Sequence, residues 1–202
     1  MKTAWVWIER ALGVSLLSGA VSSVAMAEPG ERYCIARLTL ALLQGAVGVL
    51  ILLRGPLRIS ARPAEIAAAL PSFLWGAAVM SLARPWSSWP VAAEVLFVIG
   101  GAGVILSLAT LGRCFAILPG ARGVVARGPF RMVRHPAYAC ELVMLVGCGL
   151  ALGSWWRAAG AVVIAAVLIA ARVIAEERAL GEIAEYRAYV KRTRWRLLPG
   201  AW

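Results

Sequence analysis

The chain has 202 residues, of which 61% are hydrophobic and 15% are charged. Soluble globular domains are about half apolar and about a quarter charged, so this composition excludes an ordinary soluble protein. A net charge of +11 is typical either of nucleic-acid-binding proteins or of cytoplasmic loops at a membrane, and the high apolar content favours the loops. We therefore expect membrane lipids as partners, and no nucleic acid.

Six apolar segments are predicted to form membrane helices, because a span needs about 20 mostly apolar residues. In chain order they are Ala11–Ala27, Leu38–Leu53, Ala64–Ala83, Val91–Leu111, Ala137–Leu152 and Ala158–Ile174. The first segment ends in an Ala-x-Ala sequence that is typical of a cleaved secretory signal. The apolar residues from Trp5 to Ile8 extend the tract towards the N-terminus, so a retained first helix fits the sequence equally well.

The last two segments are short and meet at a turn around Gly153, which predicts a helical hairpin. An amphipathic helix is expected to continue the last span, because apolar residues recur at helical spacing at Leu180, Ile183, Tyr186 and Val190. The predicted fold is an all-α, polytopic integral membrane helical bundle with an amphipathic cytoplasmic C-terminal helix.

One membrane domain accounts for the whole chain, residues 1–202. Residues 1–111 hold four N-terminal spans, and residues 112–202 hold the region expected to be catalytic. Most of the 21 lysines and arginines lie on the side that also holds both termini, and the positive-inside rule places that side in the cytoplasm. The abundance of arginine, alanine and glycine is typical of a bacterial protein, so we expect a location in the bacterial inner membrane.

Polar residues form two groups in the second half of the chain. His135, Tyr138 and Glu141 follow one another at intervals of three residues, close to one face of a helix. A carboxylate within an apolar span costs at least about 2.5–3.5 kcal/mol on insertion scales, so Glu141 is expected to face protein or a polar cavity.

The second group lies at the end of the last span and in the tail. Its members are Arg172, Glu176, Glu177, Tyr186, Tyr189 and Arg196. Neighbouring residues on a helix point about 100° apart, so only one of the two glutamates needs to face a site.

In their order and spacing, these residues resemble the isoprenylcysteine carboxyl methyltransferase family and the related phospholipid methyltransferases. The resemblance covers about the last ninety residues and rests on Leu111-Gly112, Gly128-Pro129-Phe130-Arg131-x-x-Arg134-His135-Pro136-x-Tyr138, Glu176-Glu177-x-x-Leu180, Tyr186-x-x-Tyr189 and Arg196-x-x-Pro199. It implies an integral membrane methyltransferase that uses S-adenosylmethionine at the cytoplasmic face. The hydrophobic acceptor is then expected to enter laterally from the bilayer.

The resemblance also implies roles for individual residues. The expected cofactor-binding residues are His135, Pro136, Tyr138, Glu176, Glu177, Tyr186 and Tyr189. The expected catalytic residues are Arg134, Glu141, Arg172 and Arg196. The acceptor is expected to be lipidic or prenylated, with the carboxylate of an isoprenylcysteine-like substrate as the leading candidate and the amine of a phospholipid as the alternative. A carboxylate needs no base, whereas an amine needs one, for which Glu141 or a tyrosine is available.

Two other hypotheses stay open at this stage. Some membrane sterol reductases resemble these methyltransferases over the same region and bind a nicotinamide cofactor, NADPH. A non-enzymatic membrane protein is the third possibility. A metal site is not expected, since the chain has one histidine and no aspartate. Gly101-Ala102-Gly103 resembles a cofactor motif of phospholipid methyltransferases, but small residues in a membrane helix more often allow close packing.

Overall fold

The computed structural model describes residues 2–26, 34–55, 59–60, 62–116 and 120–202 of the chain. Within these ranges the helices are α1 (Lys2–Ala25), α2 (Ile35–Leu53), α3 (Pro63–Leu82), α4 (Val91–Leu111), α5 (Pro136–Ala151), α6 (Trp155–Leu180) and α7 (Ala184–Arg192). Two short strands, β1 (Ile59–Ser60) and β2 (Gly120–Ala121), form an antiparallel pair between loops. The predicted all-α bundle is therefore confirmed, with this small pairing as its one addition among the described residues. Ala27, the last residue of the possible cleavage sequence, lies outside the described ranges.

Four of the helices are long and apolar enough to cross a membrane, and these are α2, α3, α4 and α6. The apolar part of α1 (Arg10–Ala25) and the whole of α5 are shorter. Large apolar side chains remain exposed on the outward faces of the bundle, for example Leu74, Ile99 and Val167. An exposed apolar face of this extent is typical of a surface in contact with lipid.

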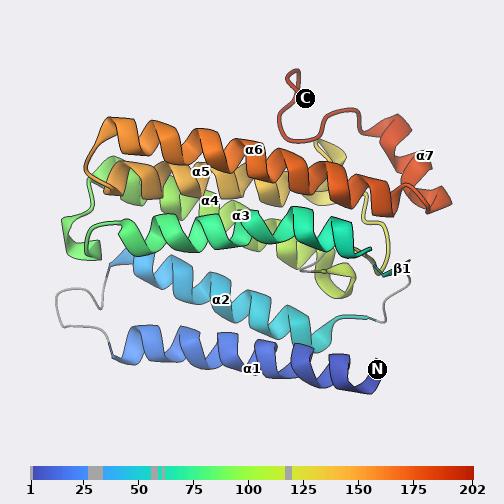
Figure 1. The fold of residues 1–202 in the computed structure, drawn as a ribbon, viewed down its shortest axis with the longest axis horizontal. Helices are drawn as coiled ribbons and strands as arrows, with labels where there is room; N and C mark the ends of the chain where they lie inside the picture. Colours follow the sequence, from blue (N-terminus) through green and yellow to red (C-terminus); the bar gives the residue numbers. More distant parts are fainter. Residues whose placement is uncertain (1, 27–33, 56–58, 61, 117–119) are drawn as a thin grey trace.

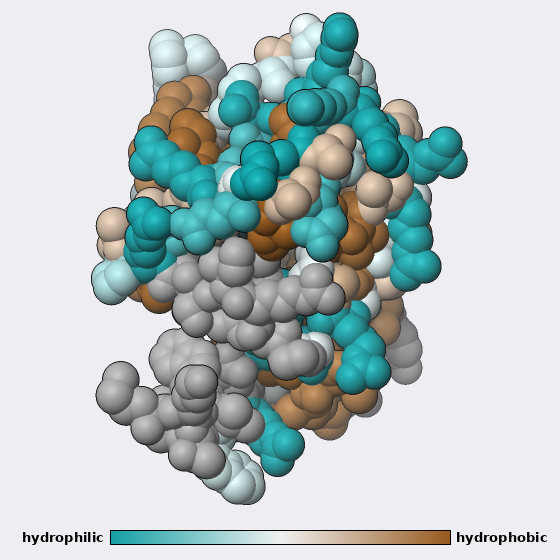
Figure 2. Space-filling model, turned by 90° about the vertical axis from the view of Figure 1, so that its right-hand side faces the viewer, coloured by the Kyte–Doolittle hydropathy of each residue, from teal (hydrophilic) through white to brown (hydrophobic). Residues whose placement is uncertain are grey.

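Helices α1 to α6 alternate in direction, so that the start of α1 and the end of α6 lie at the same end of the bundle (Figure 1). α4 and α5 form the largest helix pair, α2 packs on α4, and α6 packs on α5 and on α3. α1 packs on the outer side of α2. Hydrophilic side chains gather on the end of the bundle that carries α7 and the termini (Figure 2). The assignment of this end to the cytoplasm stays a prediction.

Close approach of α4 and its neighbours depends on glycines. A Cβ atom on Gly147 of α5 would lie 2.6 Å from the backbone oxygen of Ala93 in α4. A Cβ on Gly103 would clash with the sulfur of Cys140 in α5, and one on Gly101 would clash with Thr39 in α2. Gly101 and Gly103 thus occupy helix–helix interfaces, which supports packing as the purpose of that motif.

The predicted hairpin of the last two spans is present, but its second arm is longer than expected. α6 continues from Ile174 to Leu180, so Glu176 and Glu177 belong to the same rigid helix as Arg172. The prediction that an amphipathic helix continues the last span without a break is wrong in one respect. The helix ends at Gly181, and the extended backbone of Ile183 turns the chain before α7 begins. Glycine is a poor helix former, which explains the break.

Candidate functional site

A cavity of about 1160 Å³ extends through the bundle, lined by side chains from α1 to α7. Charged and aromatic side chains border the end of the cavity nearer α7, and we call this end the polar end. Its side chains are those of His135, Tyr138, Glu141, Arg172 and Glu176. Its remaining length is mainly apolar and includes Leu43, Met80, Val104 and Met144. The far end is bordered by Trp86, Trp89 and Phe97, and Arg37 and Arg84 also line the cavity away from the polar end. One hollow therefore joins a charged site to a long apolar channel.

Arg172 is the central cation of the polar end and is only 5% exposed. Its Nη1 atom lies 3.7 Å from Oε2 of Glu141 and donates to the hydroxyl of Ser72 at 3.4 Å. The guanidinium also lies over two rings, at 3.7 Å from the centroid of Phe73 and 4.5 Å from that of Tyr138. Ion pairing and cation–π contacts together offset the cost of a buried cation at membrane depth.

Tyr138 connects this arginine to the first of the paired glutamates. Its hydroxyl donates to Oε2 of Glu176 at 2.5 Å, a short, charge-assisted hydrogen bond. The ring of His135 stacks on Tyr138, with ring centroids 5.5 Å apart and planes 9° apart. The predicted shared helix face of His135, Tyr138 and Glu141 thus lies against one cavity.

Glu177 has different surroundings from Glu176. Its Oε1 atom accepts from Nε of Arg134 at 2.7 Å and lies 3.2 Å from Nε2 of His135, and its Oε2 accepts from Nε of Arg196 at 2.8 Å. The hydroxyl of Tyr186 donates to Oε1 at 3.3 Å. Glu176 borders the cavity, whereas Glu177 is turned away from it into this cluster of cations.

The C-terminal segment, residues 193–202, crosses the chain just before α5. The backbone N–H of Arg134 donates to the carbonyl of Trp195, and that of His135 donates to the carbonyl of Arg196, both at 2.8 Å. The guanidinium of Arg134 adds hydrogen bonds to the carbonyls of Thr193 and Arg194. The two stretches of chain are therefore tied together through backbone and side chain alike.

α7 packs its two tyrosines against the 3₁₀ turn Gly128–Arg131. The hydroxyl of Tyr189 donates to the buried carbonyl of Phe130 at 2.6 Å. Burial raises the pKa of Tyr189 to about 12, and burial also raises the pKa of Tyr186 above its ordinary value. Both hydroxyls therefore stay protonated donors at physiological pH.

Most of the predicted site residues border the cavity: Arg134, His135, Tyr138, Glu141, Arg172, Glu176, Tyr186 and Tyr189. Pro136 lies buried at the first position of α5, while Glu177 and Arg196 pair with each other beside the cavity. The structure thus brings the two sequence groups together, and the roles of these residues stay predictions.

Sequence reasoning missed Ser72 and Phe73, the partners that α3 offers to Arg172. A serine beside a proline within an apolar span is the one signal that pointed to this position.

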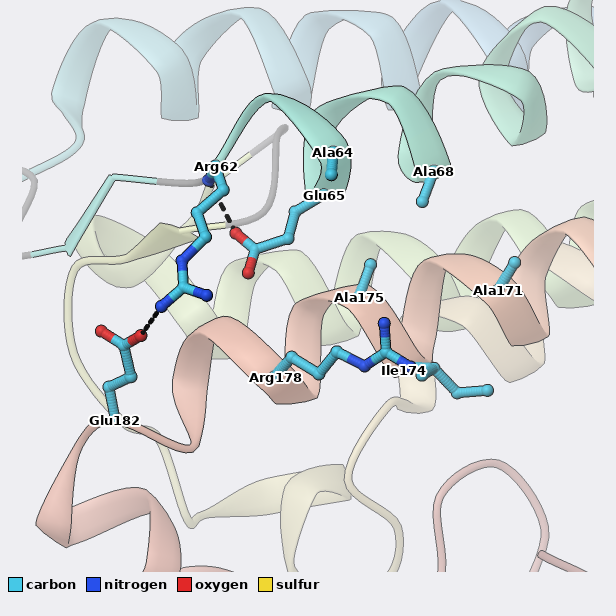
Figure 3. A pocket seen from close by; sticks show the side chains of 9 residues that line it. All are labelled: Arg62, Ala64, Glu65, Ala68, Ala171, Ile174, Ala175, Arg178 and Glu182. Carbon is cyan, nitrogen blue, oxygen red and sulfur yellow. Dashed lines mark hydrogen bonds and ion pairs between the residues drawn. The ribbon is translucent and has the colours of Figure 1, made fainter.

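A second hollow of about 540 Å³ lies between the start of α3 and the end of α6 (Figure 3). Its rim holds an ion pair of 2.7 Å between Arg62 and Glu182, and the Glu65 side chain accepts from the backbone N–H of Arg62. Both partners of the pair are at least half exposed, so the pair contributes little to stability. None of the predicted site residues borders this hollow.

Comparison with known proteins finds a family whose model matches part of the chain. Residues 89–186 match the model of the phospholipid methyltransferase family. The matched stretch contains α4 to α6 and the start of α7, which supply most of the cavity wall near its polar end. No curated protein matches the chain. The match confirms the resemblance to integral membrane methyltransferases.

Proposed function

We propose that this chain, whose residues 89–186 match the phospholipid methyltransferase family, transfers a methyl group from S-adenosylmethionine to a lipidic acceptor. The observation that carries this proposal is the single cavity with a charged end and a long apolar remainder. A charged cofactor and an apolar acceptor need these two environments in contact with each other.

The residues of the polar end fit the chemistry of S-adenosylmethionine. The cofactor has an ammonium, a carboxylate, a sulfonium and an adenine ring. Glu176 offers a carboxylate for the ammonium. Arg134 also borders the cavity, and it is available for the cofactor carboxylate through the guanidinium N–H groups that its hydrogen bonds to Glu177, Thr193 and Arg194 leave over. Tyr186 and the stacked rings of His135 and Tyr138 provide aromatic surfaces for the adenosine and the sulfonium.

The apolar length of the cavity favours an acceptor with a long hydrocarbon chain. It passes between α2, α3, α4 and α5 and ends at an aromatic floor of Trp86, Trp89 and Phe97. Trp86 and Trp89 stack at 4.6 Å, and each meets the edge of Phe97. Since α4 rises about 1.5 Å per residue, its cavity-lining stretch from Phe97 to Leu111 spans about 21 Å. One chain of isoprenoid or acyl length fits this channel.

We favour the carboxylate of an isoprenylcysteine-like compound as the acceptor. When bound, the cofactor supplies a methyl group on a positively charged sulfur. A carboxylate would take this methyl group without losing a proton, and the sulfur would leave as a neutral thioether, so the protein would only have to align the reactants and exclude water. Alignment of this kind contributes up to about 7–11 kcal/mol. Arg172 borders the cavity at its polar end, and we assign to it the orientation of the acceptor carboxylate.

A phospholipid amine is the second candidate acceptor, and the family match is the observation that favours it. N-methylation requires removal of a proton from the amine. Glu141 borders the cavity and is 27% exposed, so it is the carboxylate available to accept that proton. The two acceptors therefore assign different duties to Glu141.

Calorimetry of the protein in lipid nanodiscs, titrated with S-adenosylhomocysteine, tests the proposed cofactor. We expect binding, with affinity reduced in Glu176→Gln and unchanged in the control Glu182→Gln at the second hollow. Absence of binding by the folded protein, together with thermal stabilisation by NADPH, overturns the proposal in favour of a reductase. Absence of binding to either cofactor favours a non-enzymatic protein.

Transfer of a radiolabelled methyl group distinguishes the acceptors. N-acetyl-S-farnesylcysteine is expected to become labelled, and Glu141→Gln is expected to retain most of that activity. Labelling of phosphatidylethanolamine instead, with loss of activity in Glu141→Gln, contradicts the carboxylate acceptor and favours N-methylation.

A further inference from the structure

The paired glutamates of α6 differ in what they touch, although they are neighbours in the sequence. Glu176 borders the cavity and binds the hydroxyl of Tyr138. Both carboxylate oxygens of Glu177 are already engaged by cationic groups, and its side chain is 14% exposed. A carboxylate with both oxygens occupied has little capacity left for the ammonium of a cofactor.

Glu177 joins three segments that are far apart in the sequence. It lies in α6, Arg134 and His135 precede α5, and Arg196 belongs to the C-terminal segment. Arg134 is almost fully buried, with a side chain 6% exposed, so its pairing with Glu177 is protected from solvent screening. Removal of this carboxylate leaves two arginines close together without their shared counter-ion.

The backbone contacts around this carboxylate show what it holds in place. Arg134 and His135 donate their backbone N–H groups to Trp195 and Arg196. The end of the chain folds back on itself, because the N–H of Arg196 donates to the carbonyl of Trp202. The guanidinium of Arg196 also lies 5.0 Å from the ring centroid of Trp202. Glu177 is thus the one acidic partner, among the described residues, at the junction of α6, the His135 loop and the C-terminal segment.

We infer that Glu177 is a positioning residue that fastens the C-terminal segment to the loop carrying Arg134 and His135, and that Glu176 alone of the pair contacts the cofactor. Arg134 and His135 both border the cavity, so the fastening sets the shape of its polar end. The inference about cofactor contact rests on the proposed function. The fastening itself does not, because it is a property of the protein without ligand.

Hydrogen–deuterium exchange of the ligand-free protein tests the fastening. We expect Glu177→Gln to speed exchange at the backbone amides of Arg134 and His135 by roughly tenfold or more, because local opening becomes easier when buried cations lose their partner. Arg196→Ala is expected to act in the same way, and the double variant to add little to either. Unchanged exchange in Glu177→Gln overturns the inference. Glu176→Gln serves as the matched control and is expected to leave these amides protected.

Two ligands separate positioning from direct contact. S-adenosylhomocysteine has an amino-acid moiety, and 5′-methylthioadenosine lacks it. Glu177→Gln is expected to weaken both ligands by the same factor, because it acts through the shape of the site. Glu176→Gln is expected to weaken S-adenosylhomocysteine and to leave 5′-methylthioadenosine unchanged.

A loss in Glu177→Gln that is confined to S-adenosylhomocysteine contradicts the positioning role and assigns the ammonium to Glu177. Failure of the wild-type protein to bind either ligand overturns the proposed function, and the exchange experiment then still decides whether Glu177 fastens the C-terminal segment.

Discussion

At the scale of single residues, the site depends on charges held away from water. Arg172 has an acid, a hydroxyl and two aromatic rings around it, and no one of these contacts alone would support a cation at this depth. Around Glu177 the signs are reversed, since this one carboxylate neutralises a cluster of cationic groups. Each charge is therefore part of a set, and matched double substitutions are expected to cost less than the sum of the two single substitutions.

The pair of Arg172 and Glu141 allows a double-mutant cycle. Glu141→Gln leaves a buried cation without its acid, and we expect a loss of no more than about 3 kcal/mol, the low end for a broken buried pair, because Glu141 is 27% exposed. Arg172→Met is expected to destabilise as well. The double variant is expected to cost less than the sum of the two, as measured by unfolding in mixed micelles. Strict additivity contradicts the coupling of the two charges.

At the scale of elements, α7 and the C-terminal segment are held by few but specific contacts. α7 has only nine residues and is too short to be stable alone. Its order comes from the buried faces of Tyr186 and Tyr189 against Phe130. α4 and α5, in contrast, are held by close backbone contact along their length.

Tyr189→Phe tests the docking of α7. The carbonyl of Phe130 loses its donor while it stays buried, which costs about 1–3 kcal/mol. The pKa of Tyr189 is raised to about 12 from 10.0, so the folded state holds this proton more tightly than the unfolded chain does. The contribution of Tyr189 is therefore constant below pH 10 and is lost as the pH rises through 12. Limited proteolysis across this range is expected to show release of α7 in the wild type, and a smaller pH effect in Tyr189→Phe.

The interface of α4 and α5 is tested by Gly147→Ala. A Cβ atom at this position would lie 2.6 Å from a backbone oxygen of α4, and a backbone cannot move aside cheaply. We expect destabilisation of about 1–3 kcal/mol, typical of overpacking. Gly160→Ala in α6 is the matched control, because nothing lies within 4 Å of its Cβ, and it is expected to be neutral or slightly stabilising. Equal effects of the two variants would mean that α4 and α5 are not in close contact.

At the scale of the whole molecule, the bundle encloses a channel that no single helix defines. Its polar end is made by His135, α5 and α6, and its apolar length also needs α2, α3 and α4. The proposed chemistry depends on both parts, because the cofactor and the acceptor chain have opposite polarities. It is therefore possible to impair binding of the acceptor chain without impairing binding of the cofactor.

Gly76→Phe is designed to block the apolar channel alone. Gly76 of α3 borders the cavity, and its Cβ would meet nothing within 4 Å, so the larger side chain has room without strain in the packing. We expect methyl transfer to a farnesylated acceptor to fall at least about tenfold, because a hydrophobic pocket that no longer matches its ligand in size loses about 1–3 kcal/mol of binding free energy. Affinity for S-adenosylhomocysteine is expected to stay within about twofold. Gly160→Phe, also in open space but outside the cavity, is the control, and unchanged transfer by Gly76→Phe argues against a chain in this channel.

The helical segments, their turns and the two polar groups are predictable from the sequence alone, because apolar length and proline or glycine positions are local properties of the chain. The end of α6 at Leu180 is not predictable in this way, since the apolar spacing of the tail continues past the break between α6 and α7. That Glu176 borders the cavity while Glu177 pairs with cations, and that Ser72 and Phe73 surround Arg172, depends on the packing of distant segments. Neighbouring helical residues are distinguished by what packs against each face of the helix, and those partners come from distant parts of the chain.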